Sequence, residues 1–349
     1  MNSREIVTRA IEFRNPKRIP ATFPPPYWHD LFGASVDYPE DERSHWRKVS
    51  AARWERVDEW GNTWARLDDT SKGEVVKGAL QSLDDVESFP LPDLGNPAYY
   101  ERARLAFAKD AGDRFRVGGL PGFAFNIARK LRKLEQYLID LALDPERITI
   151  LNRRVDDLLE QMILQYARIG TDAVMLTEDW GTQKGLMINP EMWRQMFKPG
   201  FARLCKVAHD KGLKVFMHSC GKMTAIIPDL IEAGIDVLQF DQPRIHGLDT
   251  LAQWSGQVTF WCPVDIQTTL QTKDPALIEA DAQEMIAKLG NKGGGFIAGY
   301  YSDNASIGLD PKIQDIACRA FMKYGWYKLG AEDGIFSLNS SSTLEACLK

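Results

Sequence analysis

The chain has 349 residues, of which 44% are hydrophobic and 26% are charged, the balance of a globular protein rather than a disordered or fibrous one. Its formal net charge of −5 argues against broad electrostatic binding to nucleic acid or to an anionic membrane. We find no apolar run long enough to span a bilayer and no signal-peptide core at the N-terminus, so we expect a cytoplasmic protein. Five scattered cysteines are too few for a disulfide framework.

Short apolar runs alternate with amphipathic segments along most of the chain, a pattern typical of parallel βαβ units. In chain order, we expect strands over residues 18–23, 59–80 (with a hairpin-like excursion), 114–119, 171–177, 213–217, 235–240, 258–261 and 295–298. Helices are expected over residues 190–211 and 223–233, each followed by a glycine. About eight strands favour a (β/α)8 TIM barrel, here with an N-terminal helical extension.

We expect one domain over residues 1–330, because β/α barrels commonly reach this size as a single unit. Residues 331–349 contain a serine cluster and no clear period, so we expect a tail that is disordered or foreign to the domain. No glycine-rich phosphate loop follows any expected strand, which disfavours a nucleotide-binding fold.

Polar side chains gather where the expected strands end. In a β/α barrel the carboxyl ends of the strands converge on one mouth, where active sites lie. The pattern therefore indicates an enzyme. The polar strand ends are Glu178-Asp179-Trp180, His218-Ser219-Cys220, Asp241-Gln242-Pro243, Cys262-Pro263-Val264-Asp265 and Tyr300-Tyr301-Ser302-Asp303.

His218 and Cys220 are the most specific of these residues. Positions i and i+2 of a strand point to the same side, so both side chains would face the lumen. Imidazole and thiolate together suit zinc, and Cys262 is our candidate third ligand, with Glu178 and Asp241 as oxygen alternatives. The competing interpretation is that the pair only packs in the core, since cysteine is among the most buried residue types.

A few residues at the mouth are candidates for acid–base catalysis. Glu178 and Asp179 are adjacent, so only one of them points inward from a strand, and we favour Glu178. Tyr300 and Tyr301 end the last expected strand and are candidates for donating a proton to a departing oxygen. The alternative for both tyrosines is packing with a hydrated hydroxyl.

Three further residues are candidates for binding a cofactor or substrate. Trp60 belongs to a set of tryptophans and phenylalanines near the expected strand ends, which would form an apolar wall for an aromatic ligand or simply pack the loops. Gln242 and Gln267 would hydrogen-bond a polar ligand or orient the loops that carry them.

Together these segments resemble the uroporphyrinogen decarboxylase-like superfamily, and more closely its corrinoid-dependent methyltransferase and O-demethylase branch. The resemblance covers about residues 4–328. It rests on six motifs in this order: Asn15-Pro16-Lys17-Arg18-Ile19-Pro20, Asp58-Glu59-Trp60-Gly61-Asn62-Thr63-Trp64, Glu178-Asp179-Trp180-Gly181-Thr182-Gln183, Asn189-Pro190-Glu191-Met192-Trp193, Met217-His218-Ser219-Cys220-Gly221-Lys222 and Asp229 to Leu238.

The resemblance implies that His218 and Cys220 bind zinc, which activates a small-molecule methyl donor or acceptor. It also implies a corrinoid (cobalamin) that carries the methyl group on cobalt. No corrinoid-binding Asp-x-His-x-x-Gly motif occurs in the chain, so the corrinoid would come from a partner protein. A homodimer is compatible with the resemblance, and the sequence does not decide it.

Two departures from the family pattern shape the expected function. Methyltransferases that use a thiol usually carry a further cysteine at the last strand, where this chain has Phe296 to Tyr301 without one. The decarboxylase carries an arginine-rich segment after the first strand, where this chain has Pro24 to Asp30. We therefore expect a zinc-dependent methyltransferase that acts on a methoxy-aromatic substrate rather than on a thiol. A metal-free decarboxylase or lyase for a substrate smaller than uroporphyrinogen is the alternative.

Overall fold

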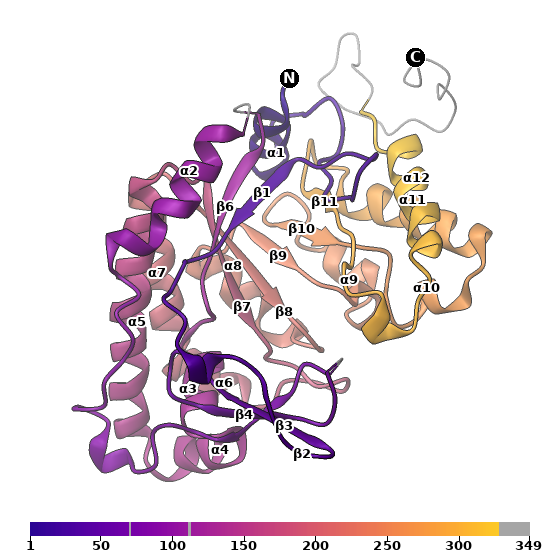
Figure 1. Cartoon of the computed structure of the whole chain (residues 1–349). Helices are drawn as coiled ribbons and strands as arrows, with labels where there is room; N and C mark the ends of the chain where they lie inside the picture. The colour runs from indigo at the N-terminus through magenta and orange to yellow at the C-terminus, as the bar shows by residue number, and fades with distance from the viewer. Residues whose placement is uncertain (70, 111–112, 328–349) are drawn as a thin grey trace.

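The computed structural model describes residues 1–69, 71–110 and 113–327. The expected tail, residues 331–349, lies outside this part. At the centre of the described fold is a curled parallel sheet of seven strands in the order β1-β6-β7-β8-β9-β10-β11 (Figure 1). The strands are β1 Leu31–Ala34, β6 Phe115–Gly119, β7 Ala173–Glu178, β8 Lys214–Ser219, β9 Val237–Gln239, β10 Thr259–Cys262 and β11 Phe296–Ala298.

The parallel α/β architecture is confirmed, but the eighth strand expected over residues 18–23 is not formed. This segment meets the sheet edge at one isolated parallel bridge, between Ala21 and Ala298 of β11, and its other bridges, Arg18 with Trp326 and Thr22 with His29, lie outside the sheet. Proline has no N–H to donate, and the segment contains Pro20 and runs into Pro24-Pro25-Pro26, so a regular ladder cannot continue. A short strand that we did not expect, β1, pairs with β6 instead.

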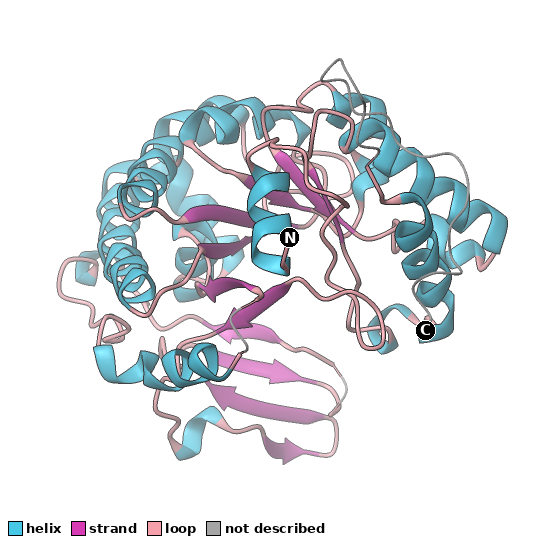
Figure 2. Ribbon diagram, turned by 90° about the horizontal axis from the view of Figure 1, so that it is seen from above, coloured by secondary structure: helices cyan, strands magenta, loops and turns pink. Residues whose placement is uncertain are grey.

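The lumen of the curled sheet is filled by alternate side chains of its strands. On β8, Phe216 faces the lumen whereas Val215 and Met217 face the surrounding helices. The helix α1 (Ser3–Ile11) lies over the end of the sheet where the strands begin, and it adds Val7 and Ile11 to this cluster (Figure 2). The buried members are Val7, Ile11, Leu31, Phe115, Val117, Ala173, Phe216, Val237 and Ile297.

Helices cover the outside of the sheet. The expected helix over residues 190–211 is split in two at Phe197, because Pro199 lacks the N–H that would continue it. No helix among the described residues combines the length and apolarity needed to cross a membrane. The other helices are α2 Glu101–Lys109, α3 Ala124–Leu131, α4 Leu134–Leu143, α5 Pro145–Arg168, α6 Pro190–Met196, α7 Lys198–Asp210, α8 Ile227–Ala233, α9 Leu248–Ala252, α10 Thr269–Thr272, α11 Pro275–Leu289 and α12 Pro311–Tyr324.

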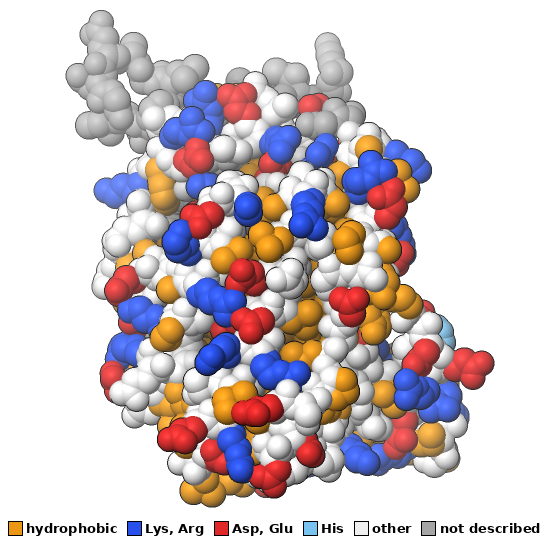
Figure 3. Space-filling model, turned by 90° about the vertical axis from the view of Figure 1, so that its left-hand side faces the viewer, with side chains coloured by type: hydrophobic (Ala, Val, Ile, Leu, Met, Phe, Trp, Pro, Cys, Tyr) orange, Lys and Arg blue, Asp and Glu red, His pale blue; other side chains and the backbone are white. Residues whose placement is uncertain are grey.

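The helix-covered face that includes α5 carries lysine, arginine, aspartate and glutamate side chains intermixed, with hydrophobic atoms scattered among them (Figure 3). Neither sign of charge dominates this face, which agrees with the small net charge of the sequence.

The excursion expected near residues 59–80 is a separate antiparallel sheet with the order β2-β3-β4-β5. It lies beyond the carboxyl ends of β7 and β8 (Figure 1). The turn between β4 and β5 reaches the loop after β11, where Lys72 Nζ lies 3.2 Å from Asp303 Oδ2. This sheet therefore lies beside the mouth. Its strands are β2 Arg47–Ser50, β3 Arg53–Val57, β4 Thr63–Arg66 and β5 Glu74–Lys77.

Candidate metal centre

His218 and Cys220 lie together at the carboxyl end of β8. His218 is two residues beyond the lumen-facing Phe216, so its imidazole enters the mouth, and Cys220 follows on the same side. The Sγ atom of Cys220 lies 3.4 Å from Nε2 of His218. The structure thus brings the two side chains together as strand geometry predicts.

Asp179 completes a group of three. One carboxylate oxygen of Asp179, the imidazole nitrogen of His218 and the sulfur of Cys220 lie within 4.8 Å of one another. The Oδ1 atom of Asp179 is 3.9 Å from Nε2 of His218 and accepts a hydrogen bond from the backbone N–H of Cys220. Tetrahedral zinc, with bonds of about 2.0–2.3 Å, separates its ligand atoms by about 3.5 Å, so the spacing is compatible with a shared ion.

The other carboxylate oxygen of Asp179 is held by Arg129 of α3, whose Nη2 donates to Oδ2 at 3.0 Å. Burial acts to raise the pKa of Asp179, but the neighbouring Arg129, followed by His218 and the backbone N–H of Cys220, outweighs it and holds that pKa below its ordinary value. Asp179 is therefore an anion at neutral pH, with Oδ1 directed to the other two groups.

A hydrogen-bond chain orients the imidazole of His218. Its Nδ1–H donates to the side-chain oxygen of Gln239 on β9, because an amide oxygen can only accept. The amide nitrogen of Gln239 donates in turn to Oδ1 of Asp241 at 2.9 Å. This arrangement leaves the lone pair of Nε2 facing Cys220, which is the orientation that a metal-binding histidine needs.

The thiol of Cys220 is protonated at neutral pH in this arrangement. Burial of the sulfur, followed by the charges of Asp179 and Asp241, raises the pKa of Cys220 to about 12, although part of the residue stays open to solvent. A bound cation would reverse this balance, since thiols coordinate zinc as thiolates.

Gly181 and Gly221 allow the two loops that carry the group to touch. Gly221 has a φ of +73°, and a Cβ there would lie 2.1 Å from the backbone oxygen of Gly181. No other residue type fits without moving one of the loops. The loops after β7 and β8 therefore hold Asp179 beside Cys220 through direct backbone packing.

Residues 68–312 match the uroporphyrinogen decarboxylase (URO-D) family, which is more than half of the chain. The chain belongs to this family. The resemblance drawn from the sequence motifs is thereby confirmed at the level of the family. No curated protein matches the sequence.

One solved structure shares the fold of this chain, and a second is less similar. A methyltransferase from Methanosarcina mazei has a TM-score of 0.60 at 14% identity, over 76% of this chain and 76% of that one. A glycosylated endo-beta-1,4-xylanase from Gloeophyllum trabeum gives a TM-score of 0.40 at 11% identity, over 65% of this chain and 80% of that one.

Glu178 does not face the mouth, which corrects the expectation that it, rather than Asp179, points inward. Its Oε1 accepts hydrogen bonds from the backbone N–H groups of Phe123 (2.6 Å) and Asn126 (3.0 Å), and the side chain is fully buried. Burial, only partly offset by these two bonds, raises its pKa to about 8. Glu178 thus anchors the start of α3, the helix that carries Arg129.

Cys262, our candidate third metal ligand, is not part of the group that the structure brings together. Its side chain belongs to the hydrophobic core between the sheet and the helices, whereas its neighbour Trp261 packs against the lumen cluster. Burial raises the pKa of Cys262 far above that of a free thiol. Alternation along β10 therefore turns Cys262 away from His218.

The two tyrosines end up in the loop after β11. The hydroxyl of Tyr300 accepts a hydrogen bond from Asn304 at 3.2 Å, and that of Tyr301 lies 3.3 Å from the hydroxyl of Ser306. Lys72 of the antiparallel sheet interacts with Tyr301 and also lowers the pKa of Cys220 slightly through its charge. Lys72 therefore lies beside Tyr301 and Asp303 in the loop after β11.

The residues expected to bind a cofactor are spread around the mouth. Trp60 is buried in the core, and its indole N–H donates to Glu59 Oε1 at 3.1 Å. Gln242 accepts a hydrogen bond from Gln183 at 3.1 Å, which links the loops after β9 and β7. Gln267 is exposed. The structure does not bring these three into one group.

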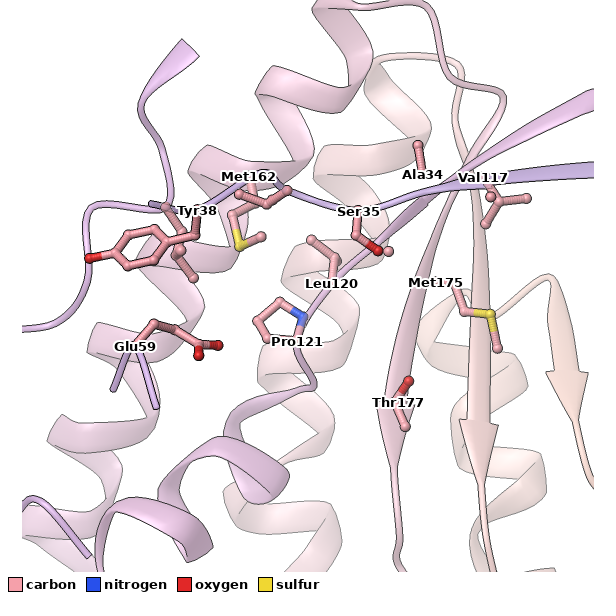
Figure 4. A pocket seen from close by; sticks show the side chains of 14 residues that line it. Ala34, Ser35, Tyr38, Glu59, Val117, Leu120, Pro121, Met162, Met175 and Thr177 are labelled. Atoms are coloured by element: carbon pink, nitrogen blue, oxygen red, sulfur yellow. The ribbon is translucent and has the colours of Figure 1, made fainter. Parts of the chain in front are cut away.

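A cavity of about 410 Å³ opens between the ends of β1, β6 and β7 (Figure 4). Thr177 of β7 lies in its wall and pairs in register with His218 of β8, so the cavity reaches one strand away from the imidazole. The lining residues are Gly33, Ala34, Ser35, Val36, Tyr38, Glu59, Leu94, Val117, Gly119, Leu120, Pro121, Met162, Met175 and Thr177.

Sequence reasoning ranked Asp179 behind Glu178 as the inward-pointing residue, and it missed Arg129 and Gln239 as parts of this site. Strands of a parallel sheet covered by helices are apolar on both faces, so the sequence around Glu178 does not tell which neighbour points inward. Gln239 carried one usable signal, since it is polar within an otherwise apolar run. Arg129 carried none, because arginines are common in helices.

Proposed function

We propose that this URO-D family member is a zinc-dependent methyltransferase that moves a methyl group between a small, methoxy-aromatic substrate and a corrinoid on a partner protein. The observation that carries the proposal is the grouping of Asp179, His218 and Cys220 within 4.8 Å at the mouth. Three protein ligands with one open position are the usual arrangement of a catalytic rather than a structural zinc site.

The chemistry of the three donors fits zinc. Sulfur, imidazole nitrogen and carboxylate oxygen are all zinc ligands, and both His218 and Asp179 have outer partners, Gln239 and Arg129, that fix their orientation. When bound, the zinc would act as a Lewis acid on the substrate oxygen or sulfur. The corrinoid would carry the methyl group, and the protein would orient the substrate and manage its proton.

Tyr301 and Tyr300 are the proposed proton handlers, with Tyr301 preferred because the Lys72 side chain interacts with its hydroxyl. A phenol beside an ammonium group can donate a hydrogen bond to a developing phenolate and take part in its protonation. Glu178 is assigned a positioning role through α3, since its side chain is buried behind β7. Two comparisons support a methyltransferase: the family match and the fold shared with the Methanosarcina mazei methyltransferase.

Zinc stoichiometry is the first test. The purified protein, loaded with zinc and freed of excess metal, should hold about one zinc per chain by elemental analysis. His218→Ala, Cys220→Ser and Asp179→Asn should each lose it. His45→Ala, at an exposed histidine, and Cys262→Ala should keep it. Loss of zinc in Cys262→Ala with retention in Asp179→Asn would contradict the assigned ligand set.

Methyl transfer is the second test. Cob(I)alamin and a panel of methoxy-aromatic compounds are incubated with the zinc-loaded protein, and formation of methylcobalamin is followed by its visible spectrum. In this reaction the methyl–oxygen bond breaks, a methyl–cobalt bond forms, and the aromatic product leaves as a phenol after taking a proton. Absence of transfer from every methyl donor, despite one bound zinc, would refute the proposal.

The same experiments address the alternative, a metal-free decarboxylase or lyase. That function predicts no zinc dependence and release of carbon dioxide from a carboxylated substrate. The family match by itself is compatible with it. The grouping of Asp179, His218 and Cys220 favours the metal-dependent reaction.

A further inference from the structure

The cavity beside the candidate metal centre has an unusual distribution of charge. Among its lining residues, Glu59 is the one carboxylate, and none is a lysine, arginine or histidine. In the part of the chain that the structure describes, Glu59 forms no ion pair, and it accepts a hydrogen bond from the neutral indole of Trp60. The cavity therefore offers a negative charge with no internal counter-charge.

An aromatic ring lies at the same end as this carboxylate. Figure 4 shows Tyr38 and Glu59 at one end of the cavity and Met175 and Thr177 at the other. Burial is the main reason why the pKa of Tyr38 is raised, and the charges of Tyr99, Glu59 and Asp93 add to it, which reflects a negative potential around this ring. A carboxylate beside an aromatic face is a combination that binds organic cations.

The rest of the cavity is apolar. Leu120, Pro121 and Met162 line its middle, Val117 and Met175 lie at the far end, and Thr177 leads toward His218 (Figure 4). A volume of about 410 Å³ is in the range of small-ligand sites and accommodates a single substituted aromatic ring. Methionine side chains adapt to flat ligands because they are flexible and polarisable.

We propose that this cavity selects the substrate, and that it takes a small apolar molecule carrying an ammonium group. The ammonium group lies between Glu59 and Tyr38, and the methyl-bearing end is directed past Thr177 toward His218. The inference rests on the proposed function for the direction of the ligand, but not for the charge preference. The inference states that the substrate is a cation rather than a carboxylate.

Calorimetric binding of three probes of similar shape tests the charge preference. They are 4-methoxybenzylammonium, neutral 4-methylanisole and anionic 4-methoxybenzoate, each titrated into the whole protein at pH 7 and low salt. We expect the cation to bind at least ten times more tightly than the other two, the effect of about one charge-assisted contact at a solvent-accessible site. Added salt should reduce the difference, because the carboxylate is exposed.

Two variants localise the effect. Glu59→Gln should remove the preference for the cation, whereas Glu87→Gln, at an exposed glutamate that does not line the cavity, should keep it. Gly33→Leu should abolish binding of all three probes, because a Cβ at Gly33 meets no atom within 4 Å and the longer side chain would fill the cavity. Circular dichroism of each variant verifies that it is folded.

The outcomes separate this inference from the proposed function. Equal binding of the three probes, tighter binding of the anion, or a cation preference that survives in Glu59→Gln would overturn the inference. Binding should persist in His218→Ala, because the cavity does not use the imidazole for the charge. A cation preference without any methyl transfer would refute the proposed function and would still support the charge selectivity of the cavity.

Discussion

Replacing Glu178 by glutamine tests the buried carboxyl group behind the candidate metal centre. Glutamine keeps the side-chain oxygen that accepts from Phe123 and Asn126, so the start of α3 should be unchanged. The second oxygen of Glu178 has no hydrogen-bond partner among the described residues, so an amide nitrogen there breaks no existing bond. The substitution therefore removes mainly the ability to ionise.

The expected effect on stability follows from the pKa of Glu178. Burial raises it to about 8 in the folded protein, whereas an ordinary glutamate in the unfolded chain titrates near 4.5. The folded protein thus holds a proton that the unfolded chain has lost between these values. The contribution of Glu178 is fully present below pH 4.5 and is lost as the pH rises toward 8, at a rate of up to about 1.4 kcal/mol per pH unit.

The whole effect is of the order of 5 kcal/mol, since about 3.5 pH units separate the two pKa values. Glu178→Gln should be close to the parent protein in stability at pH 5 and clearly more stable at pH 9. Urea unfolding of both proteins at several pH values, with a chelator present, measures the difference. Zinc content measured separately should not change, because Glu178 does not face Asp179, His218 and Cys220.

Glu87→Gln is the matched control, since Glu87 is exposed and its replacement should leave the pH profile unaltered. A Glu178→Gln variant whose stability falls from pH 5 to pH 9 as steeply as that of the parent would refute the reasoning. A variant that is less stable than the parent at pH 9 would do so too, because it would mean that the carboxylate is stabilised in place.

Three further predictions concern the mouth and the sheet edge. Zinc binding should release a proton from Cys220, whose pKa is about 12 without metal, so zinc affinity should rise about tenfold per pH unit near neutrality. Titration of zinc into the protein in a weakly buffered indicator solution detects the proton. A zinc affinity that does not change with pH would contradict the prediction. Gly221→Ala should lower the free energy of unfolding by more than about 2 kcal/mol and weaken zinc binding, because the new Cβ would clash with the backbone of Gly181. Gly308→Ala is the control: Gly308 has a φ of +61° but open space around it, so this variant should lose about 1 kcal/mol. Arg18→Met should cost about 3–5 kcal/mol in urea unfolding, because it leaves the buried carboxylate of Asp30 without its counter-charge. A loss below about 1 kcal/mol would show that the ion pair contributes little.

The sequence by itself determined the strands that carry the site and the pairing of two of its residues. The apolar runs bounded by glycine located six of the seven strands of the sheet. Because side chains two apart on a strand share a face, His218 and Cys220 had to lie together once that strand was recognised. Local periodicity was sufficient for both conclusions.

The tertiary structure decided which neighbouring strands complete the site. Glu178 and Asp179 compete for one inward position on a strand that is apolar on both faces. Asp179 takes it because the fold turns Met175 and Thr177 of the same strand toward the lumen. Cys262 is two strands from β8, and it lies on the helix-covered face of β10, so its side chain enters the core. Whether the segment around Pro20 forms a sheet strand likewise depends on the tertiary structure, because a strand beside β11 must donate backbone N–H groups that proline lacks.

The charge of the cavity is the property furthest from the reach of sequence reasoning. Glu59 lies in the turn between β3 and β4 of the antiparallel sheet, far along the chain from Thr177, and only the folding of that sheet beside the mouth brings the two into one cavity. Side chains alternate between the two faces of any strand, so the residues that share a face can be read from the local sequence. Which distant segments meet depends on packing that no local pattern encodes.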